Sequence, residues 1–421
     1  MVRSYEKIIC ACGFLFLFAN VGLPSTAFSV YQPYLVDIPG VGDGGASLII
    51  SVRMAVSLAA MFVVDRYYRR LDCRAGIALA SAMTGVGFAV YALTSLLAPG
   101  LPGFFVGAVF AGMGYGFGGM VGITLLAGRW YRTRVGTALG IATLGSGISS
   151  IVLPPLVLVL IEGVSLGCAF AMEAAIAFAI AGVVWAFVRN RPADLGLLPH
   201  GAVAGEPVDE GPKAKAHGLS EESRPASIRR TRLVMLVAMF FVGAVSIGAV
   251  AYFSILMTSS GFDRGFAAFA LSISGISLTA AKLGLGELID RLGIAWGTAI
   301  GFGALVAGLA LCCLAPLQNT VVQIIAAVLF GAGISIGSVG VSVWSIALSD
   351  ESSRAKTVRD FQVCYAAGGL LCDIFPGFIA EVTGTYVTAF IILLVTTTAA
   401  AIAITGVFIR RKHIAERYRD I

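Results

Sequence analysis

The chain has 421 residues, of which 58% are hydrophobic and only 12% are charged, and its mean hydropathy is +0.92. Soluble domains carry about 25% charged residues, so this composition excludes an ordinary soluble protein and indicates that lipid solvates most of the chain. The net charge of +6 suits a nucleic-acid-binding protein, but the distribution of the cations described below argues against a nucleic-acid partner.

Long apolar runs follow one another along the sequence. A helix needs roughly 20 apolar residues to cross the hydrocarbon core of a bilayer, and lipid cannot satisfy free backbone N–H and C=O groups, so each run is expected to be helical. We therefore predict an all-α integral membrane protein with twelve transmembrane helices. The runs lie approximately at 8–34, 45–65, 74–97, 103–128, 136–161, 166–189, 232–258, 266–289, 295–315, 321–348, 357–380 and 386–410.

One long polar segment, 190–231, separates the sixth run from the seventh. It contains prolines and mixed charge and almost no large apolar residue, a composition that buries too little surface to order itself fully. We predict an N-terminal six-helix bundle at 1–189, a cytoplasmic linker at 190–231, a C-terminal six-helix bundle at 232–410 and a cytoplasmic tail at 411–421. The two bundles would form a parallel repeat about an axis along the membrane normal.

The Lys and Arg residues fall almost entirely on one side of this topology. With the N terminus inside, only three of the 29 cations, Arg53, Arg264 and Lys282, lie outside the N-terminal end, the even-to-odd loops and the tail. This is the pattern of the positive-inside rule. It predicts a multi-pass protein of the cytoplasmic membrane with both termini in the cytoplasm.

Small residues and prolines mark the fourth and fifth runs. Gly112 and Gly116 are one of several small-xxx-small pairs in the fourth run, which allow helix backbones to approach closely in lipid. We expect these glycines to serve helix packing rather than ligand contact. Pro154 and Pro155 are expected to break the fifth helix, because consecutive prolines remove intrahelical hydrogen bonds.

Two related charged stretches follow the second and eighth runs. Gly286, Asp290, Arg291 and Gly293 form the pattern G-x-x-x-D-R-x-G, and a degraded copy keeps Asp65 and Arg66 but lacks both glycines. Twelve helices in two halves with this motif resemble the Major Facilitator Superfamily. The resemblance implies that Gly286, Asp290, Arg291 and Gly293, with Asp65 and Arg66, act at an inner gate. Anchoring of the topology is the alternative role for the arginines.

A narrower resemblance runs through the middle of the N-terminal half. The segments Arg129–Tyr131, Arg134–Gly140, Gly145–Gly147 and Pro154–Pro155, with RPADLGLLPHG at Arg191–Gly201, are similar to the monocarboxylate porters and the oxalate/formate antiporters.

These families carry cations that meet the carboxylate of the substrate, and this sequence keeps one of them. Lys282 matches the lysine of the eighth helix in the oxalate/formate branch. The second lysine of that branch, in the eleventh helix, is replaced here by Gly368. The lysine of the animal monocarboxylate branch belongs in the first helix near Val30, where this chain has none. The second buried cation of this chain is Arg53 instead.

Helical rise places both cations near the bilayer midplane. Lys282 is eight residues before Asp290, about 12 Å, and Arg53 is twelve before Asp65, about 18 Å, whereas the midplane lies about 15 Å deep. We predict that Arg53 and Lys282 bind the substrate carboxylate together, Arg53 as a bidentate fork and Lys282 as a point charge. A fixed ion pair with Asp373, or a bond to a backbone carbonyl, is the structural alternative.

Other polar residues in the apolar runs complete the predicted site. Asp373 is a candidate for proton coupling, because burial and a nearby cation shift the pKa of a carboxyl in opposite directions. Glu173 is a weaker candidate for a crevice residue. Six further side chains are candidates for substrate contact, although helix packing is the more frequent role of each: Asn20, Tyr31, Tyr115, Trp344, Gln362 and Tyr365.

The sequence thus predicts a secondary transporter of a small organic anion, most simply a monocarboxylate, driven by a proton or by exchange and functional as a monomer. Two alternatives remain open: a membrane sensor that binds a carboxylate without turnover, and an exporter of hydrophobic drugs, which two midplane cations disfavour. No P-loop, metal-ligand cluster or nucleophile–histidine pair is found. We therefore expect neither enzymatic activity nor a cofactor or metal.

Overall fold

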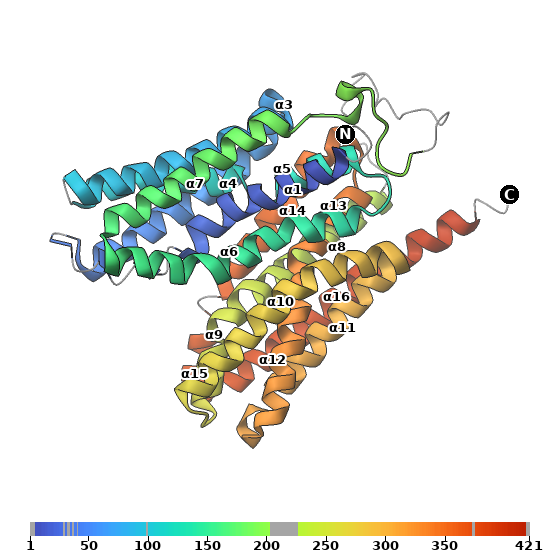
Figure 1. The fold of residues 1–421 in the computed structure, drawn as a ribbon. Helices are drawn as coiled ribbons and strands as arrows, with labels where there is room; N and C mark the ends of the chain where they lie inside the picture. The colour runs from blue at the N-terminus through green and yellow to red at the C-terminus, as the bar shows by residue number, and fades with distance from the viewer. Residues whose placement is uncertain are drawn as a thin grey trace. The chain divides into compact units, whose positions relative to one another are not determined.

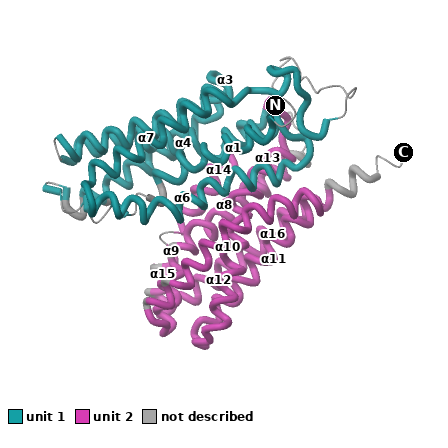
Figure 2. The backbone as a smooth tube through the Cα atoms, viewed as in Figure 1, with its two compact units in different colours: residues 1–204, 353–359 teal, residues 205–352, 360–421 magenta. Residues whose placement is uncertain are grey.

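The chain is almost entirely helical in the computed structural model, which describes residues 5–27, 30–31, 34–35, 38–39, 41–97, 100–202, 226–372 and 375–417 (Figure 1). Within these ranges the β-pairing consists of one isolated bridge between Tyr131 and His200. The helices form two compact units, which are described separately: residues 1–204 with 353–359, and residues 205–352 with 360–421 (Figure 2).

Unit 1 is a helical bundle in which α3 packs against α4 and α7, and α1 packs against α6. Its elements are α1 (Tyr5–Leu17), η2 (Phe18–Ala27), α3 (Gly42–Leu97), α4 (Leu101–Phe117), α5 (Met120–Trp130), α6 (Val135–Gly163), α7 (Leu166–Phe187) and the 3-10 helix η3 (Pro192–Leu195). Helix α3 contains the second and third predicted runs, which meet at a kink at Asp72. Of the predicted linker 190–231, residues 190–202 are described and include η3, and 203–225 lie outside the described residues. Residues 226–231 are already helical, so the linker ends earlier than predicted.

Unit 2 is a second bundle, in which α12 packs against α10 and α11, and α16 packs against α8, α11 and α15. Its elements are α8 (Ala226–Gly243), η5 (Ala244–Gly248), α9 (Ala249–Ser259), α10 (Arg264–Leu292), α11 (Ile294–Cys312), η6 (Ala315–Leu317), α12 (Thr320–Ile334), η7 (Ser335–Gly337), α13 (Val339–Ala347), α14 (Glu351–Cys372), α15 (Phe375–Thr383) and α16 (Tyr386–Arg417). Residues 353–359 of α14 belong to unit 1.

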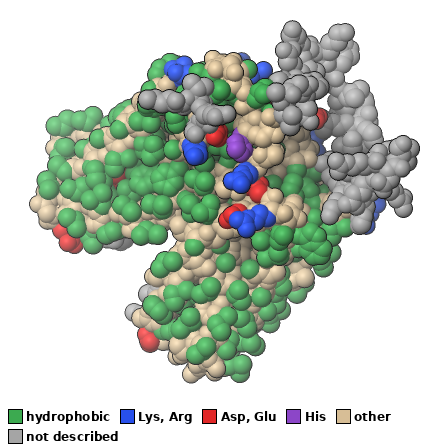
Figure 3. Space-filling view, turned by 45° about the vertical axis from the view of Figure 1, so that its right-hand side comes forward, with side chains coloured by type: hydrophobic (Ala, Val, Ile, Leu, Met, Phe, Trp, Pro, Cys, Tyr) green, Lys and Arg blue, Asp and Glu red, His purple; other side chains and the backbone are tan. Residues whose placement is uncertain are grey.

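Helices long and apolar enough to cross a membrane account for ten candidate spans within the described ranges. One of them, Leu48–Leu97, is 50 residues long and contains two predicted spans on either side of the Asp72 kink. The predicted eleventh span corresponds to α14 and α15. Large hydrophobic side chains are exposed on many of these helices, and hydrophobic side chains are spread over much of the surface in Figure 3. The prediction of an all-α integral membrane protein is confirmed.

The first span of each unit contains a π-helical segment. In unit 1 it is η2, which contains Pro24, and in unit 2 it is η5, which lies between α8 and α9. A π-helix leaves the regular i to i−4 pattern of backbone hydrogen bonds and occurs frequently at functional sites. The prediction that both runs are helical holds for these segments, but no sequence pattern indicated their π-helical register.

Glycines bring helix backbones into direct contact, as predicted. A Cβ added to Gly112 would lie 2.6 Å from the carbonyl oxygen of Arg53, and one added to Gly116 would lie 2.6 Å from that of Ser57. Helices α3 and α4 therefore pack backbone to backbone. The predicted break at Pro154 and Pro155 is not found, because α6 remains helical from Val135 to Gly163.

Candidate functional site

Arg53 of unit 1 lies in the interior of α3 with only 6% of its surface exposed. The helix is regular from Arg53 to Asp65, so the depth predicted from helical rise applies to the folded chain. The guanidinium group is near the phenol groups of Tyr91, which is farther along α3, and of Tyr115 in α4. Close packing of Gly112 against the Arg53 backbone holds α4, and with it Tyr115, beside the cation. Arg53 and Tyr115, which were predicted separately as site residues, thus lie near each other, and Tyr91 is a neighbour that no sequence pattern identified.

An aromatic cluster continues from Tyr91 into the core of unit 1. The ring of Phe170 lies 5.2 Å from that of Tyr91 and 4.1 Å from that of Tyr31, with which it is stacked. The hydroxyl of Tyr31 faces the carboxyl group of Glu173, which is completely buried on α7. Aromatic packing therefore connects the cation of α3 to a buried acid.

Asn20 has its hydrogen-bonding groups occupied within unit 1. Its amide donates to the Phe16 carbonyl at 3.0 Å and to the Ser81 hydroxyl at 2.7 Å, and its oxygen accepts from Thr84 at 2.8 Å. These bonds join the π-helical segment to the third span. These bonds indicate a role of Asn20 in helix packing, and its contact with a substrate stays a prediction.

Lys282 of unit 2 lies inside α10 and is 7% exposed. The helix is continuous from Lys282 to Asp290, so the rise-based depth again applies. Asp373, the predicted proton-coupling residue, lies outside the described residues and stays a prediction. Because Arg53 and Lys282 belong to different units, their joint binding of one anion also stays a prediction.

Trp344 is packed within the core of unit 2. Its indole N–H donates to the Thr298 hydroxyl at 2.9 Å, and its ring stacks on Phe302 with centroids 5.9 Å apart. The side chain is completely buried. Its one hydrogen-bond donor is therefore used to join α13 to α11.

Tyr365 of α14 meets two irregular segments of unit 2. A Cβ added to Gly337 in η7 would lie 2.8 Å from the Tyr365 hydroxyl and 2.6 Å from the Ser246 hydroxyl of η5. Ser246 and Gln362 are buried. Polar side chains thus converge where the seventh and tenth spans leave regular α-helix, and Ser246 is a candidate that no local sequence signal identified.

The first copy of the charged motif forms an ion-pair cluster around a buried aspartate. Asp65 is 5% exposed and accepts from Arg69 at 3.1 Å and from Arg359 at 2.8 Å. Arg359 belongs to the 353–359 segment of unit 1, and the sequence analysis did not identify it. Arg66, the predicted gating partner, is exposed.

The second copy ends α10. Arg291 pairs with Glu287 at 2.5 Å on an exposed surface, and Gly286 is buried. Asp290 is half-buried. Gly293 has φ 84°, a left-handed conformation that favours glycine, and connects α10 to α11. The motif thus terminates the eighth span with a short turn.

Comparisons with known proteins agree with this architecture. The sequence profile of the Major Facilitator Superfamily matches residues 10–371, whereas no curated protein sequence matches the chain. Among solved structures, the E. coli fucose:proton symporter FucP is 18% identical over 96% of this chain and 99% of that chain, with a TM-score of 0.70. The human organic anion transporter MFSD10 (TETRAN) is 13% identical over 94% of this chain and 99% of that chain, with a TM-score of 0.69. These identities show a shared fold, and because the profile spans most of the sequence, the chain belongs to the Major Facilitator Superfamily.

Proposed function

We propose that the chain is a secondary transporter that moves a small organic anion, most simply a monocarboxylate, by alternating access. Membership of the superfamily supports a transporter rather than an enzyme. The observation that supports an anionic substrate is the buried cation inside a transmembrane helix of each unit, Arg53 and Lys282. A Lys or Arg at the centre of such a helix costs about 2.5–3.5 kcal/mol on insertion scales, which is a reason to expect that each has a function.

The surroundings of the two cations support different tasks in carboxylate binding. Arg53 can offer two parallel N–H donors to one carboxylate, and Tyr91 and Tyr115 beside it can add hydroxyl donors and an apolar wall. Lys282 supplies a compact charge from α10. Tyr365, Gln362 and Ser246 are the polar candidates of unit 2 for the remainder of the substrate. We propose that transport is driven either by a proton that Asp373 carries or by exchange with a second anion.

We propose a relationship to the monocarboxylate porters and oxalate/formate antiporters, a location in the cytoplasmic membrane with both termini inside, and function as a monomer. In this topology Asp65 and Arg359, with Asp290 and Arg291, act at the cytoplasmic ends of the helices. Making and breaking the Asp65–Arg359 pair is then the proposed step of the inner gate.

Uptake into proteoliposomes tests the anion site. Lys282→Ala and Arg53→Gln are expected to lower the uptake of a radiolabelled monocarboxylate at least about tenfold, while Lys282→Arg, which keeps the charge, retains part of it. Arg230→Ala, which removes an exposed cation of α8, is the matched control and should transport normally. Full uptake by both neutral variants contradicts the anion site. Binding of the acid without accumulation supports a sensor, and uptake of hydrophobic cations instead of acids supports a drug exporter.

A further inference from the structure

The two segments that resemble the monocarboxylate porters, Arg129–Tyr131 with Arg134–Gly140 and Arg191–Gly201, are joined in unit 1. His200 donates its backbone N–H to the Trp130 carbonyl at 2.8 Å, and its carbonyl accepts from the N–H groups of Arg132 and Thr133. The segment after α7 is thereby fastened to the connection between α5 and α6. The residues of this junction are not among those proposed above to bind the anion.

The start of α1 closes against the same junction. The Tyr131 hydroxyl donates to the Glu6 carbonyl at 2.6 Å, and Tyr5 stacks on Trp130 with centroids 5.6 Å apart. Burial, with Cys10 and Glu6 nearby, raises the pKa of Tyr131. Tyr131 therefore contributes a neutral hydroxyl and no charge.

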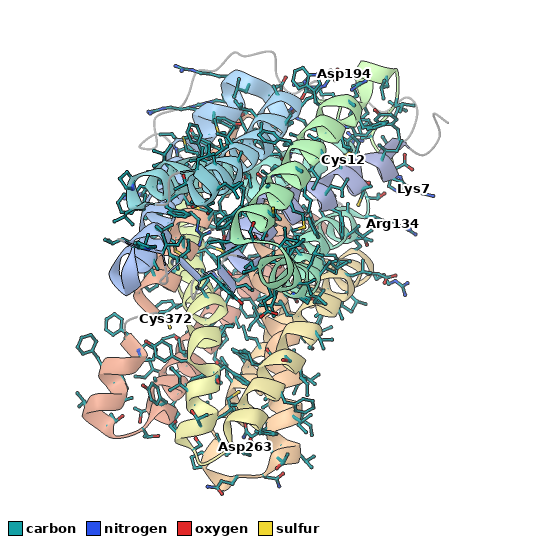
Figure 4. The ribbon with its side chains drawn as sticks, turned by 60° about the vertical axis from the view of Figure 1, so that its left-hand side comes forward. Lys7, Cys12, Arg134, Asp194, Asp263 and Cys372 are labelled. Carbon is teal, nitrogen blue, oxygen red and sulfur yellow. The ribbon has the colours of Figure 1, made fainter. Side chains whose placement is uncertain are left out.

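An open groove with a volume of about 560 Å³ lies between α1 and the beginning of α6. Lys7, Arg134 and His200 line it at the end where the two helices begin, and Phe14, Leu15 and Ile141 line it farther along. Figure 4 shows Lys7 and Arg134 close together at that end of unit 1. Glu6 is the one acid among the lining residues, so Lys7 and Arg134 leave a surplus of one positive charge with His200 neutral.

The groove has the dimensions and the polarity gradient of the membrane interface. Phe14 and Ile141 each follow the charged residue of their helix, Lys7 or Arg134, by seven positions, which corresponds to about 10 Å of helical rise. Lys7 is near the beginning of one candidate span, and Arg134 directly precedes another. A cationic rim at headgroup level thus leads into an apolar channel at the level of the acyl chains.

The backbone of Arg134 indicates that the rim is held in place. Arg134 has φ 60° and ψ 30°, a left-handed conformation that costs energy for a residue with a side chain. Arg134 is the residue directly before α6, and its side chain lines the groove. Gly201, which follows His200, has φ 84°, and a Cβ there would lie 2.1 Å from the Thr133 hydroxyl.

We propose that this groove binds one anionic phospholipid of the leaflet on the N-terminal side of the membrane, which is the cytoplasmic leaflet in the topology proposed above. The phosphate lies among Lys7, Arg134 and His200, and one acyl chain lies along Phe14, Leu15 and Ile141. Charge complementarity selects an anionic headgroup over a zwitterionic one. Bound lipid fills the space between α1 and α6 and stabilises unit 1.

Thermal unfolding and native mass spectrometry of the purified full-length protein test the proposal. Phosphatidylglycerol is expected to raise Tm and to remain bound as one molecule, and phosphatidylcholine with the same acyl chains should do neither. Each Lys or Arg near an anionic headgroup contributes about fivefold in affinity, so Lys7→Gln combined with Arg134→Asn should weaken binding roughly 30-fold. Asparagine tolerates the left-handed conformation of position 134.

Two further variants test whether lipid binding depends on the rim cations and the open groove or only on the overall charge of the protein. Arg132→Gln removes an exposed cation of the same connection that does not line the groove, and it should bind phosphatidylglycerol as wild type does. Ala11→Phe keeps both cations but fills the groove, and it should lose the retained lipid. Equal stabilisation by phosphatidylcholine, wild-type affinity in the double variant, or an equal effect of glycerol 1-phosphate alone overturns the proposal.

Discussion

Gly368 of α14 stands where the oxalate/formate branch carries a lysine, and its surroundings predict that this chain tolerates no side chain there. A Cβ added to Gly368 would lie 1.8 Å from the carbonyl oxygen of Phe240 and 2.7 Å from its carbonyl carbon. It would also lie 3.0 Å from the backbone nitrogen of Ala244. All three contacts are with the backbone of α8 and η5, so no side-chain rotation relieves the overlap.

The Gly368→Ala substitution is therefore expected to destabilise unit 2. An ordinary van der Waals contact begins at 3.4 Å, so α8 and α14 must separate locally by about 1.6 Å. Overpacking of this kind costs about 1–3 kcal/mol, and backbone contacts favour the upper value. In a chain segment of 150–250 residues each kcal/mol lowers Tm by about 2–4 °C, so we expect a fall of roughly 6–12 °C in thermal unfolding of the purified protein.

Gly303→Ala in α11 is the matched control. A Cβ at Gly303 meets no atom within 4 Å, and alanine is a better helix former than glycine, so Tm should stay the same or rise slightly. If Gly368→Ala unfolds at the same temperature as Gly303→Ala, the close approach of α8 and α14 is refuted. If Gly368→Ala unfolds at a lower temperature than Gly303→Ala, close packing excludes a lysine at position 368. A second cation then has to come from another helix, as Arg53 does.

Three further substitutions separate structural roles from transport roles. Arg359→Gln removes one of the two arginines that pair with the buried Asp65 and leaves Arg69, and it should cost about 1–3 kcal/mol; the charge swap Asp65→Arg with Arg359→Asp should recover part of this loss in thermal unfolding. Asn20→Ala removes three hydrogen bonds and should cost about 2 kcal/mol with the KM of uptake unchanged. Trp344→Phe removes the bond to Thr298 and should cost about 1 kcal/mol, whereas a raised KM would assign Trp344 to substrate contact.

The membrane spans could be predicted closely because a backbone in lipid must satisfy its hydrogen bonds internally, which requires a helix in an all-α protein. Apolar length and the need to satisfy backbone hydrogen bonds suffice to place a helix, and Gly112 and Gly116 pack against α3 as their spacing predicted. The π-helical segments were missed because their register depends on tertiary contacts. Pro24 is the one proline of η2, and η5 contains no proline.

The side-chain partners could be predicted less well, because they are set by contacts distant in sequence. Arg359 pairs with Asp65 across 294 positions, and no local pattern connects them. Asn20 and Trp344 have the composition expected of a binding site, yet their polar groups bond within the units. A polar residue in an apolar run indicates burial, but the sequence does not show whether it faces a substrate path or a neighbouring helix.

In the degraded first copy of the motif, the helix ends at a later position than in the second copy because one glycine is replaced. Gly293 ends α10 three positions after Asp290 in a left-handed conformation. Tyr68 is at the equivalent position after Asp65, and a bulky residue avoids positive φ. The helix therefore continues for one more turn, and the kink occurs at Asp72, with φ 61°.

The additional turn of the first copy is held by contacts of its own. The Tyr68 hydroxyl donates to the Phe117 carbonyl at 2.8 Å, and Asp72 pairs with Arg129 at 2.9 Å. Continuation of the helix also places Arg69 one turn after Asp65, at the i+4 spacing from which it pairs with the carboxylate at 3.1 Å. The loss of the motif glycine thus moves the turn and gives Asp65 a cationic partner on its own helix, so the first copy is a rearranged version of the second rather than a vestige of it.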